Sequence, residues 1–216
     1  MFKQFLNSLK RPNNVTLIEA IQKGYQACFE SIELYHGSGK QFSSFLMNKV
    51  GTGEGIQKFG YGIYFTESKD IAKFYAEQAI KGSVIYKVSV PSDLFFAEWD
   101  ESADTYANQI LKTAKNWKKS NIDDLMDTFG LSDGYEGQSD TFGSLYGLIA
   151  GILGSQKKAS GFLLKASIDG IKYQSGTLSN IDDSDYYNYV IFDQNVAKIK
   201  ETTNFPQKTL KQLPTS

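Results

Sequence analysis

Two short runs decide the fold of this chain: LYHGS at residues 34–38 and FGYGIYFT at residues 59–66, the second continuing as ESKDIAKFY at 67–75. Residues 32–36 form a short apolar run that ends at Gly-Ser-Gly. This pattern is typical of a buried strand that runs into a tight loop. The only histidine of the chain, His36, lies at the end of that predicted strand.

The second run predicts a strand that leads directly into a helix. Side chains of different character alternate over residues 61–65, so Tyr64 is expected on the face opposite to its apolar neighbours. Ser68 is suited to cap a helix N-terminus. Apolar residues then recur at three- and four-residue spacing, which predicts an amphipathic helix that closes near Gly82 and packs Tyr75 against the domain.

Composition excludes several classes of protein. The 216 residues are enough for one domain with a full core, and a net charge of −1 gives no footprint for tight, non-specific nucleic-acid binding. The single cysteine, Cys28, rules out an intramolecular disulfide and fits a reducing compartment. One histidine and one cysteine supply too few ligands for a metal site. Residues 1–12 lack the continuous apolar segment of a signal peptide, so we expect a cytoplasmic protein with no membrane contact.

The rest of the chain predicts an α+β domain with a helical insert. The further predicted strands cover residues 84–91, 171–173, 187–192 and 196–199. The helical stretch at about 102–166 interrupts strands on either side, so it is interpreted as an insert. The last two strands are expected to form a hairpin across residues 193–195. The predicted organisation is an N-terminal leader and helix at 1–32, a domain at 33–200 and a polar tail at 201–216.

These motifs resemble the diphtheria-toxin/poly-ADP-ribose-polymerase class of ADP-ribosyltransferases: YHGS, then FGYGIYF, then a tyrosine eleven residues after Tyr64. The runs GTGEGIQKFGYG at 51–62, IDGIKY at 168–173 and NYVIFD at 188–193 are similar to transferase domains of phage and mobile-element polyvalent proteins. The similarity covers residues 33–200. It implies a split antiparallel β-sheet core with flanking helices, and NAD+ as a substrate.

The resemblance also implies roles for the residues that match its motifs. His36 is expected to hydrogen-bond the adenosine-side ribose. Gly37, with Ser38 beside it, is expected to contact the nicotinamide carboxamide, because a glycine allows close approach. Tyr64 and Tyr75 are expected to stack on the two faces of the nicotinamide ring. The structural alternatives are a buried strand-end histidine, a turn glycine and ordinary core aromatics.

Two positions depart from the family pattern. Ala72 stands where many relatives have a serine that bonds the carboxamide, and Asn188 stands where the polymerases have a glutamate. A neutral amide can bond a ribose hydroxyl, but it cannot act as a general base or offer charge to a developing cation. We therefore expect mono-ADP-ribosylation rather than chain elongation. Glu54 is a candidate substitute carboxylate, the alternative being a solvated loop charge, and Asp185 is a further candidate.

The expected function is therefore an NAD+-dependent mono-ADP-ribosyltransferase of the toxin, effector or phage host-modifying type. The near-neutral charge favours a protein acceptor over nucleic acid. An antitoxin or immunity partner is compatible with such a role. Three alternatives stay open: an NAD+ glycohydrolase, a non-catalytic NAD+- or ADP-ribose-binding module, which Asn188 and Ala72 favour, and a structural protein without a ligand.

Overall fold

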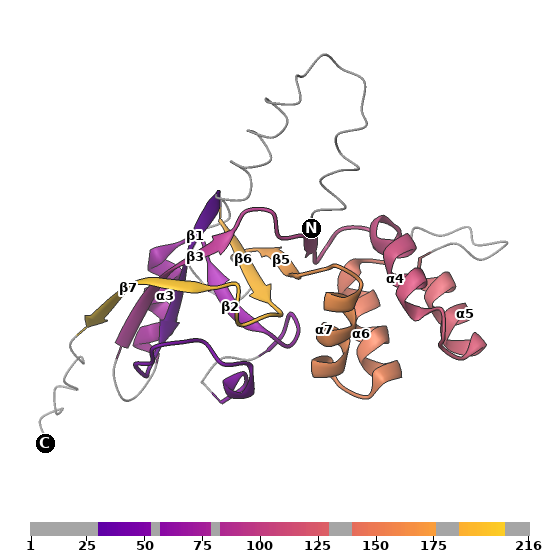
Figure 1. Ribbon diagram of the computed structural model, residues 1–216, viewed down its shortest axis with the longest axis horizontal. Helices are drawn as coiled ribbons and strands as arrows, with labels where there is room; N and C mark the ends of the chain where they lie inside the picture. Colours follow the sequence, from indigo (N-terminus) through magenta and orange to yellow (C-terminus); the bar gives the residue numbers. More distant parts are fainter. Residues whose placement is uncertain (1–29, 53–56, 79–82, 130–139, 176–185, 206–216) are drawn as a thin grey trace, which may run out of the picture.

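The computed structural model describes residues 30–52, 57–78, 83–129, 140–175 and 186–205. Within these residues the architecture is α+β, with five α-helices and one seven-stranded mixed sheet in the order β4-β5-β6-β2-β1-β3-β7 (Figure 1). The α+β class predicted from the sequence is confirmed. The predicted N-terminal helix lies outside the described residues.

The strands, in chain order, are β1 (Ser31–Ser38), β2 (Ile63–Thr66), β3 (Ser83–Pro91), β4 (Phe96–Glu98), β5 (Gly170–Gln174), β6 (Tyr187–Ile191) and β7 (Lys198–Phe205). The α-helices are α3 (Lys69–Glu77), α4 (Ala107–Ala114), α5 (Lys119–Thr128), α6 (Phe142–Leu153) and α7 (Gln156–Lys165). Two 3₁₀ turns, η1 (Met47–Lys49) and η2 (Ala103–Tyr106), complete the described elements. Neighbouring strands are antiparallel except β4 and β5, which are parallel.

The sheet opens between β1 and β2. These strands pair at one position, Tyr35 with Thr66, whereas β1 pairs with β3 along its whole length from Ser31 to Ser38. The end of β1 from His36 onward therefore has no ladder with β2 on that side.

Helix α3 covers the β1–β3 end of the sheet (Figure 1). It begins as predicted, because the Ser68 side chain accepts a hydrogen bond from the Ile71 N–H. Its buried face carries Ile71, Ala72 and Ala76, and the two alanines pack against Ile85 of β3. These small side chains let the helix backbone lie close to the sheet.

The alternation predicted for β2 is confirmed. Ile63 and Phe65 belong to one buried cluster, whereas Tyr64 packs against a different one. Phe45, from the loop between β1 and β2, is buried in the same cluster as Ile63 and Phe65. The two faces of the sheet therefore support separate cores.

The helices α4 to α7 gather beyond β5 in Figure 1 and share a core with the sheet. Ile149 of α6 and Leu163 of α7 lie in the same buried cluster as Ile171 of β5 and Val190 of β6. The helical segment is thus built onto one face of the sheet. Among the described residues, no helix combines the length and apolar character needed to cross a membrane.

Strand β7 corrects two predictions. It pairs with β3, whereas β6 pairs with β2 and β5, so β6 and β7 do not form the expected hairpin. It also continues to Phe205, so residues 201–205 of the predicted tail belong to the sheet. Most side chains of β7 are exposed, because it is an edge strand. Its sequence therefore lacks the alternation of apolar and polar residues that would have revealed it.

Candidate functional site

Three candidate side chains project from one face of the sheet. Residues directly opposite each other on neighbouring antiparallel strands share a face. Asn188 of β6 lies opposite both Thr66 of β2 and Tyr173 of β5. Tyr64 lies opposite Val190, two residues along β6 and on the same face. The sheet thus brings Tyr64, Asn188 and Tyr173 together, although they are far apart in the sequence.

Helix α3 adds Tyr75 to this group. Tyr35, which is directly opposite Thr66, packs against α3, so the helix lies on the same side of the sheet as the other site residues. Tyr75 is half-buried. Burial raises the pKa of Tyr173, and the neighbouring phenols of Tyr64 and Tyr75 raise that pKa further. Tyr75 therefore belongs to a helix on the same side of the sheet as Tyr64 and Tyr173.

The side-chain amide of Asn188 is buried without a partner. Asn188 is 8% exposed, and its amide makes no hydrogen bond to any described residue. Buried polar side chains nearly always have a partner, because an unmade hydrogen bond costs about 1–3 kcal/mol. Within the described part of the chain, Gln109 Nε2 is the one fully enclosed polar atom without a partner, so the Asn188 amide remains reachable. It offers two donors and one acceptor to a ligand.

The ring of Tyr64 is fixed by its hydroxyl group. That hydroxyl donates to the Gly60 carbonyl at 2.8 Å and accepts from the Phe59 N–H at 3.2 Å. Burial raises the pKa of Tyr64, so the phenol stays protonated. With its hydroxyl engaged, Tyr64 can offer the flat face of its ring to a ligand but not a free hydrogen-bonding group.

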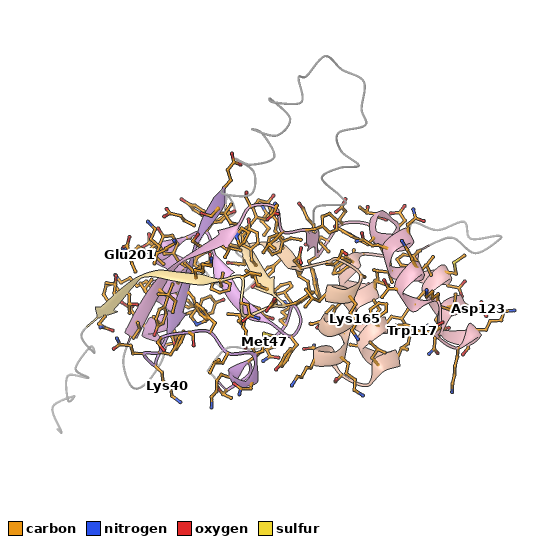
Figure 2. The ribbon with its side chains drawn as sticks, viewed as in Figure 1. Lys40, Met47, Trp117, Asp123, Lys165 and Glu201 are labelled. Carbon is orange, nitrogen blue, oxygen red and sulfur yellow. The ribbon has the colours of Figure 1, made fainter. Side chains whose placement is uncertain are left out.

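A buried hydroxyl network holds the loop that anchors Tyr64. The Tyr146 hydroxyl of α6 accepts from the Tyr61 N–H at 2.9 Å, and Ser160 of α7 donates to the Tyr61 carbonyl at 2.7 Å. The two hydroxyl oxygens, of Tyr146 and Ser160, are 2.9 Å apart. The Tyr61 hydroxyl donates to the carbonyl of Met47, which is labelled in Figure 2. The Met47 N–H in turn donates to Gln194 Oε1. The helical segment is thereby tied to the strand that carries Tyr64.

His36 lies on the opposite face of the sheet from Asn188. Its Nδ1 is 2.8 Å from the Tyr64 carbonyl, across the opening between β1 and β2. Its ring lies among four aromatic rings, those of Phe42, Phe45, Phe65 and Tyr86. Burial lowers the pKa of His36, and the bond to the Tyr64 carbonyl opposes that shift only in part. The imidazole is therefore neutral, with Nδ1 protonated and Nε2 free to accept.

The other predicted site residues have structural surroundings of their own. A Cβ atom on Gly37 would come within 1.8 Å of the Ala72 carbonyl oxygen, so glycine is required here by the close approach of α3. Ala72 is 1% exposed and packs into the cluster beneath α3. Ser38 is half-buried and accepts from the Lys40 N–H at 3.2 Å. Glu54 and Asp185 lie outside the described residues.

A hollow of about 440 Å³ borders the site at the β4–β5 edge, and Tyr173 is one of its lining residues. Its charged lining residues are Glu98, Asp100, Glu101 and Lys172. Because carboxylates outnumber the lysine, this hollow disfavours a diphosphate group. No cluster of side chains suited to hold a metal ion occurs in the described ranges.

No protein-family model, curated protein or solved structure matches this chain.

Sequence reasoning missed three residues of this region. Tyr173 belongs to the IDGIKY motif, but the sequence assigns it no role because a predicted strand alone does not say which face its side chain occupies. Tyr146 and Ser160 sit within apolar helical patterns, where one hydroxyl carries no signal of its own. Only the packing of α6 and α7 on the Gly60–Tyr61 loop reveals their part.

Proposed function

We propose that this chain is an NAD+-dependent mono-ADP-ribosyltransferase that modifies a macromolecule and releases nicotinamide. The observation that carries the proposal is the largely buried amide of Asn188, which makes no hydrogen bond to a described residue and lies on the same face of the sheet as Tyr64 and Tyr173. Aromatic faces next to an unsatisfied amide suit a flat, uncharged ring attached to a sugar. A nicotinamide riboside has this form.

The opening between β1 and β2, where His36 lies, also supports the proposal. His36 Nδ1 is already engaged, so Nε2 is the atom that would accept from an adenosine-side ribose. Because His36 and Asn188 lie on opposite faces of the sheet, NAD+ would have to pass through the opening between β1 and β2 to contact both. The acidic hollow at the β4–β5 edge repels phosphate, so the diphosphate would run toward β1 and away from that hollow. The opening between β1 and β2 is compatible with the split sheet expected from the family resemblance.

The proposed reaction replaces the bond between ribose and nicotinamide with a bond between ribose and the acceptor. The bond between ribose and nicotinamide breaks, its electrons leave with the ring, and nicotinamide departs neutral. Positive charge develops on the ribose, the acceptor forms a new bond to the same carbon, and the acceptor proton is lost to water or a base. The tyrosine rings would orient the nicotinamide, and Asn188 would hold a ribose hydroxyl without adding charge.

A neutral amide favours transfer of one unit over chain growth. An elongating enzyme must activate the hydroxyl of an already attached sugar, which calls for a general base. Asn188 cannot remove a proton, and no carboxylate shares its cross-strand row of Thr66 and Tyr173. We therefore propose a reactive acceptor on a protein, with Glu54 or Asp185 as a candidate helper.

A second candidate function is a non-catalytic NAD+- or ADP-ribose-binding module. The burial of Ala72 favours it, because its methyl group packs beneath α3 and offers no hydrogen bond to a carboxamide. NAD+ glycohydrolysis, with water as the acceptor, is the other alternative.

Nicotinamide release and thermal stabilisation together separate these functions. A transferase releases nicotinamide mainly when an acceptor is added, whereas a glycohydrolase releases it in buffer alone. A binding module gains stability from NAD+ without turnover; saturation at 100 times Kd corresponds to about 2.7 kcal/mol. Loss of the stabilisation in Asn188→Ala, but not in Asn195→Ala on the exposed turn after β6, supports the assigned site.

A further inference from the structure

We infer that Tyr173 is a substrate-binding residue that, together with Asn188, holds the hydroxyl groups of the ribose next to the bond that breaks. This inference rests on the proposed function. It adds a residue to the site and gives it a specific chemical partner, a cis-diol.

The Tyr173 hydroxyl is a second polar group, on a largely buried residue, without a partner among the described residues. Tyr173 is 6% exposed, and its hydroxyl makes no hydrogen bond to any described residue. Like the Asn188 amide, it is not among the fully enclosed polar atoms, so a ligand can reach it. Other buried tyrosines nearby are satisfied: the Tyr189 hydroxyl donates to Glu67 at 2.6 Å, and the Tyr146 hydroxyl lies 2.9 Å from Ser160 Oγ.

Tyr173 and Asn188, the residues that carry these two groups, are cross-strand neighbours. Tyr173 and Asn188 are directly opposite each other on β5 and β6. Side chains at such positions leave the sheet about 4.5–5.5 Å apart at Cβ and point the same way. Two cross-strand neighbours whose polar groups do not bond each other can bind different hydroxyls of one sugar.

The ring of Tyr173 is held by stacking and not by its hydroxyl. Its centroid lies 3.7 Å from that of Phe59, with 15° between the ring planes. Phe59 is itself fixed, since Trp99 packs edge-on against it at 5.1 Å and its N–H donates to the Tyr64 hydroxyl. One residue thus orients both Tyr64 and Tyr173, and it leaves the Tyr173 hydroxyl free for a ligand.

The phenol is suited to binding and not to proton removal. Burial raises the pKa of Tyr173, so the hydroxyl keeps its proton at physiological pH. A protonated phenol can donate one hydrogen bond and accept others, while the Asn188 amide does both with separate atoms. Together they can satisfy two sugar hydroxyls, each of which donates and accepts.

Carbocyclic NAD+, which cannot be cleaved, separates binding from chemistry in the test. Calorimetry measures the Kd of three ligands for the wild type and for Tyr173→Phe. The ligands are carbocyclic NAD+ and its 2′-deoxy and 3′-deoxy forms, in which the hydroxyl is removed from the sugar on the nicotinamide side. We expect Tyr173→Phe to weaken binding of the intact diol about 3- to 10-fold. For the deoxy form that lacks the hydroxyl bonded by Tyr173, we expect the wild type and Tyr173→Phe to have the same Kd.

The matched control is Tyr189→Phe, the same substitution at an equally buried tyrosine on the opposite face of the sheet. It should leave all three Kd values unchanged, whereas its Tm should fall because Glu67 loses a donor. Tyr173→Phe should keep the wild-type Tm. An equal loss for all three ligands, or none, overturns the inference and leaves the proposed function standing. Failure of the wild type to bind carbocyclic NAD+ overturns the proposed function, and the inference with it.

Discussion

The imidazole of His36 donates from Nδ1 to the backbone carbonyl of Tyr64 at 2.8 Å, across the gap where β1 and β2 no longer pair. A carbonyl oxygen can only accept, so the bond fixes the tautomer and leaves Nε2 as an acceptor. It also links the two residues that the sequence motifs single out, although their side chains lie on opposite faces of the sheet. His36 therefore orients the backbone of the strand that carries Tyr64.

This relationship predicts a loss of stability in mild acid. Burial lowers the pKa of His36 below its ordinary value of 6.5, so below that value the unfolded chain binds a proton that the folded protein does not. The free energy of unfolding should fall as the pH drops from about 7 to about 5.5, by at most about 1.4 kcal/mol per pH unit. Urea unfolding of the wild type and of His36→Gln at both pH values measures this. An equal pH dependence in the two proteins would contradict it, since His36 is the only histidine.

Substitution of Asn188 should lower NAD+ turnover without lowering the Tm. The Asn188 amide makes no hydrogen bond to a described residue, and Val is similar in size, so we expect the Tm of Asn188→Val to stay close to that of the wild type. NAD+ turnover should fall at least about 10-fold, as expected when a transition-state contact is lost. Differential scanning fluorimetry and nicotinamide release measure the two quantities. A large fall in Tm would show that the amide has a structural partner.

The Tyr146–Ser160 network should affect both the free energy of unfolding and the KM for NAD+. Tyr146→Phe leaves the Tyr61 N–H without its buried partner, and we expect a loss of about 1–3 kcal/mol in the free energy of unfolding. The loop that anchors Tyr64 then loosens, so the KM for NAD+ should rise. Tyr186→Phe, at a tyrosine that is 42% exposed, is the control and should change neither. An unaltered KM in Tyr146→Phe would mean that the helical segment does not position Tyr64.

Gly37 should tolerate no side chain, for a reason independent of any ligand. A methyl group there would come within 1.8 Å of the Ala72 carbonyl, so α3 must move away from the sheet. We expect Gly37→Ala to lower the free energy of unfolding by about 1–3 kcal/mol. Gly147→Ala, on α6, has open space around the added methyl and provides the comparison by chemical denaturation. Equal stability of the two variants would contradict the close packing of α3.

The parts of the fold that could be predicted are those whose burial repeats along the chain. Alternation gave the orientation of Tyr64 in β2, and three- and four-residue spacing with a serine cap gave α3. Strand pairing is not encoded in such local patterns. The partnership of β7 with β3, and the place of β6 between β2 and β5, depend on contacts between distant segments.

The candidate site divides in the same way. The resemblance to the transferases named Tyr64 and Tyr75 as candidates, and their placement on β2 and α3 could be predicted because strand and helix follow each other directly. Tyr173 could not, because it joins Asn188 only through the register of β5 with β6. Gly37 shows the converse: its motif suggested a ligand contact, while the packing of α3 supplies a sufficient structural reason for the glycine.

The most direct test of the central claim is transfer of label from NAD+. The purified protein is incubated with a bacterial lysate and NAD+ labelled in its adenylate phosphate, beside Asn188→Ala as the control. The proposed function predicts a discrete labelled protein band that is absent in the control, with nicotinamide released in step. The absence of both a labelled macromolecule and released nicotinamide from the wild type would contradict it.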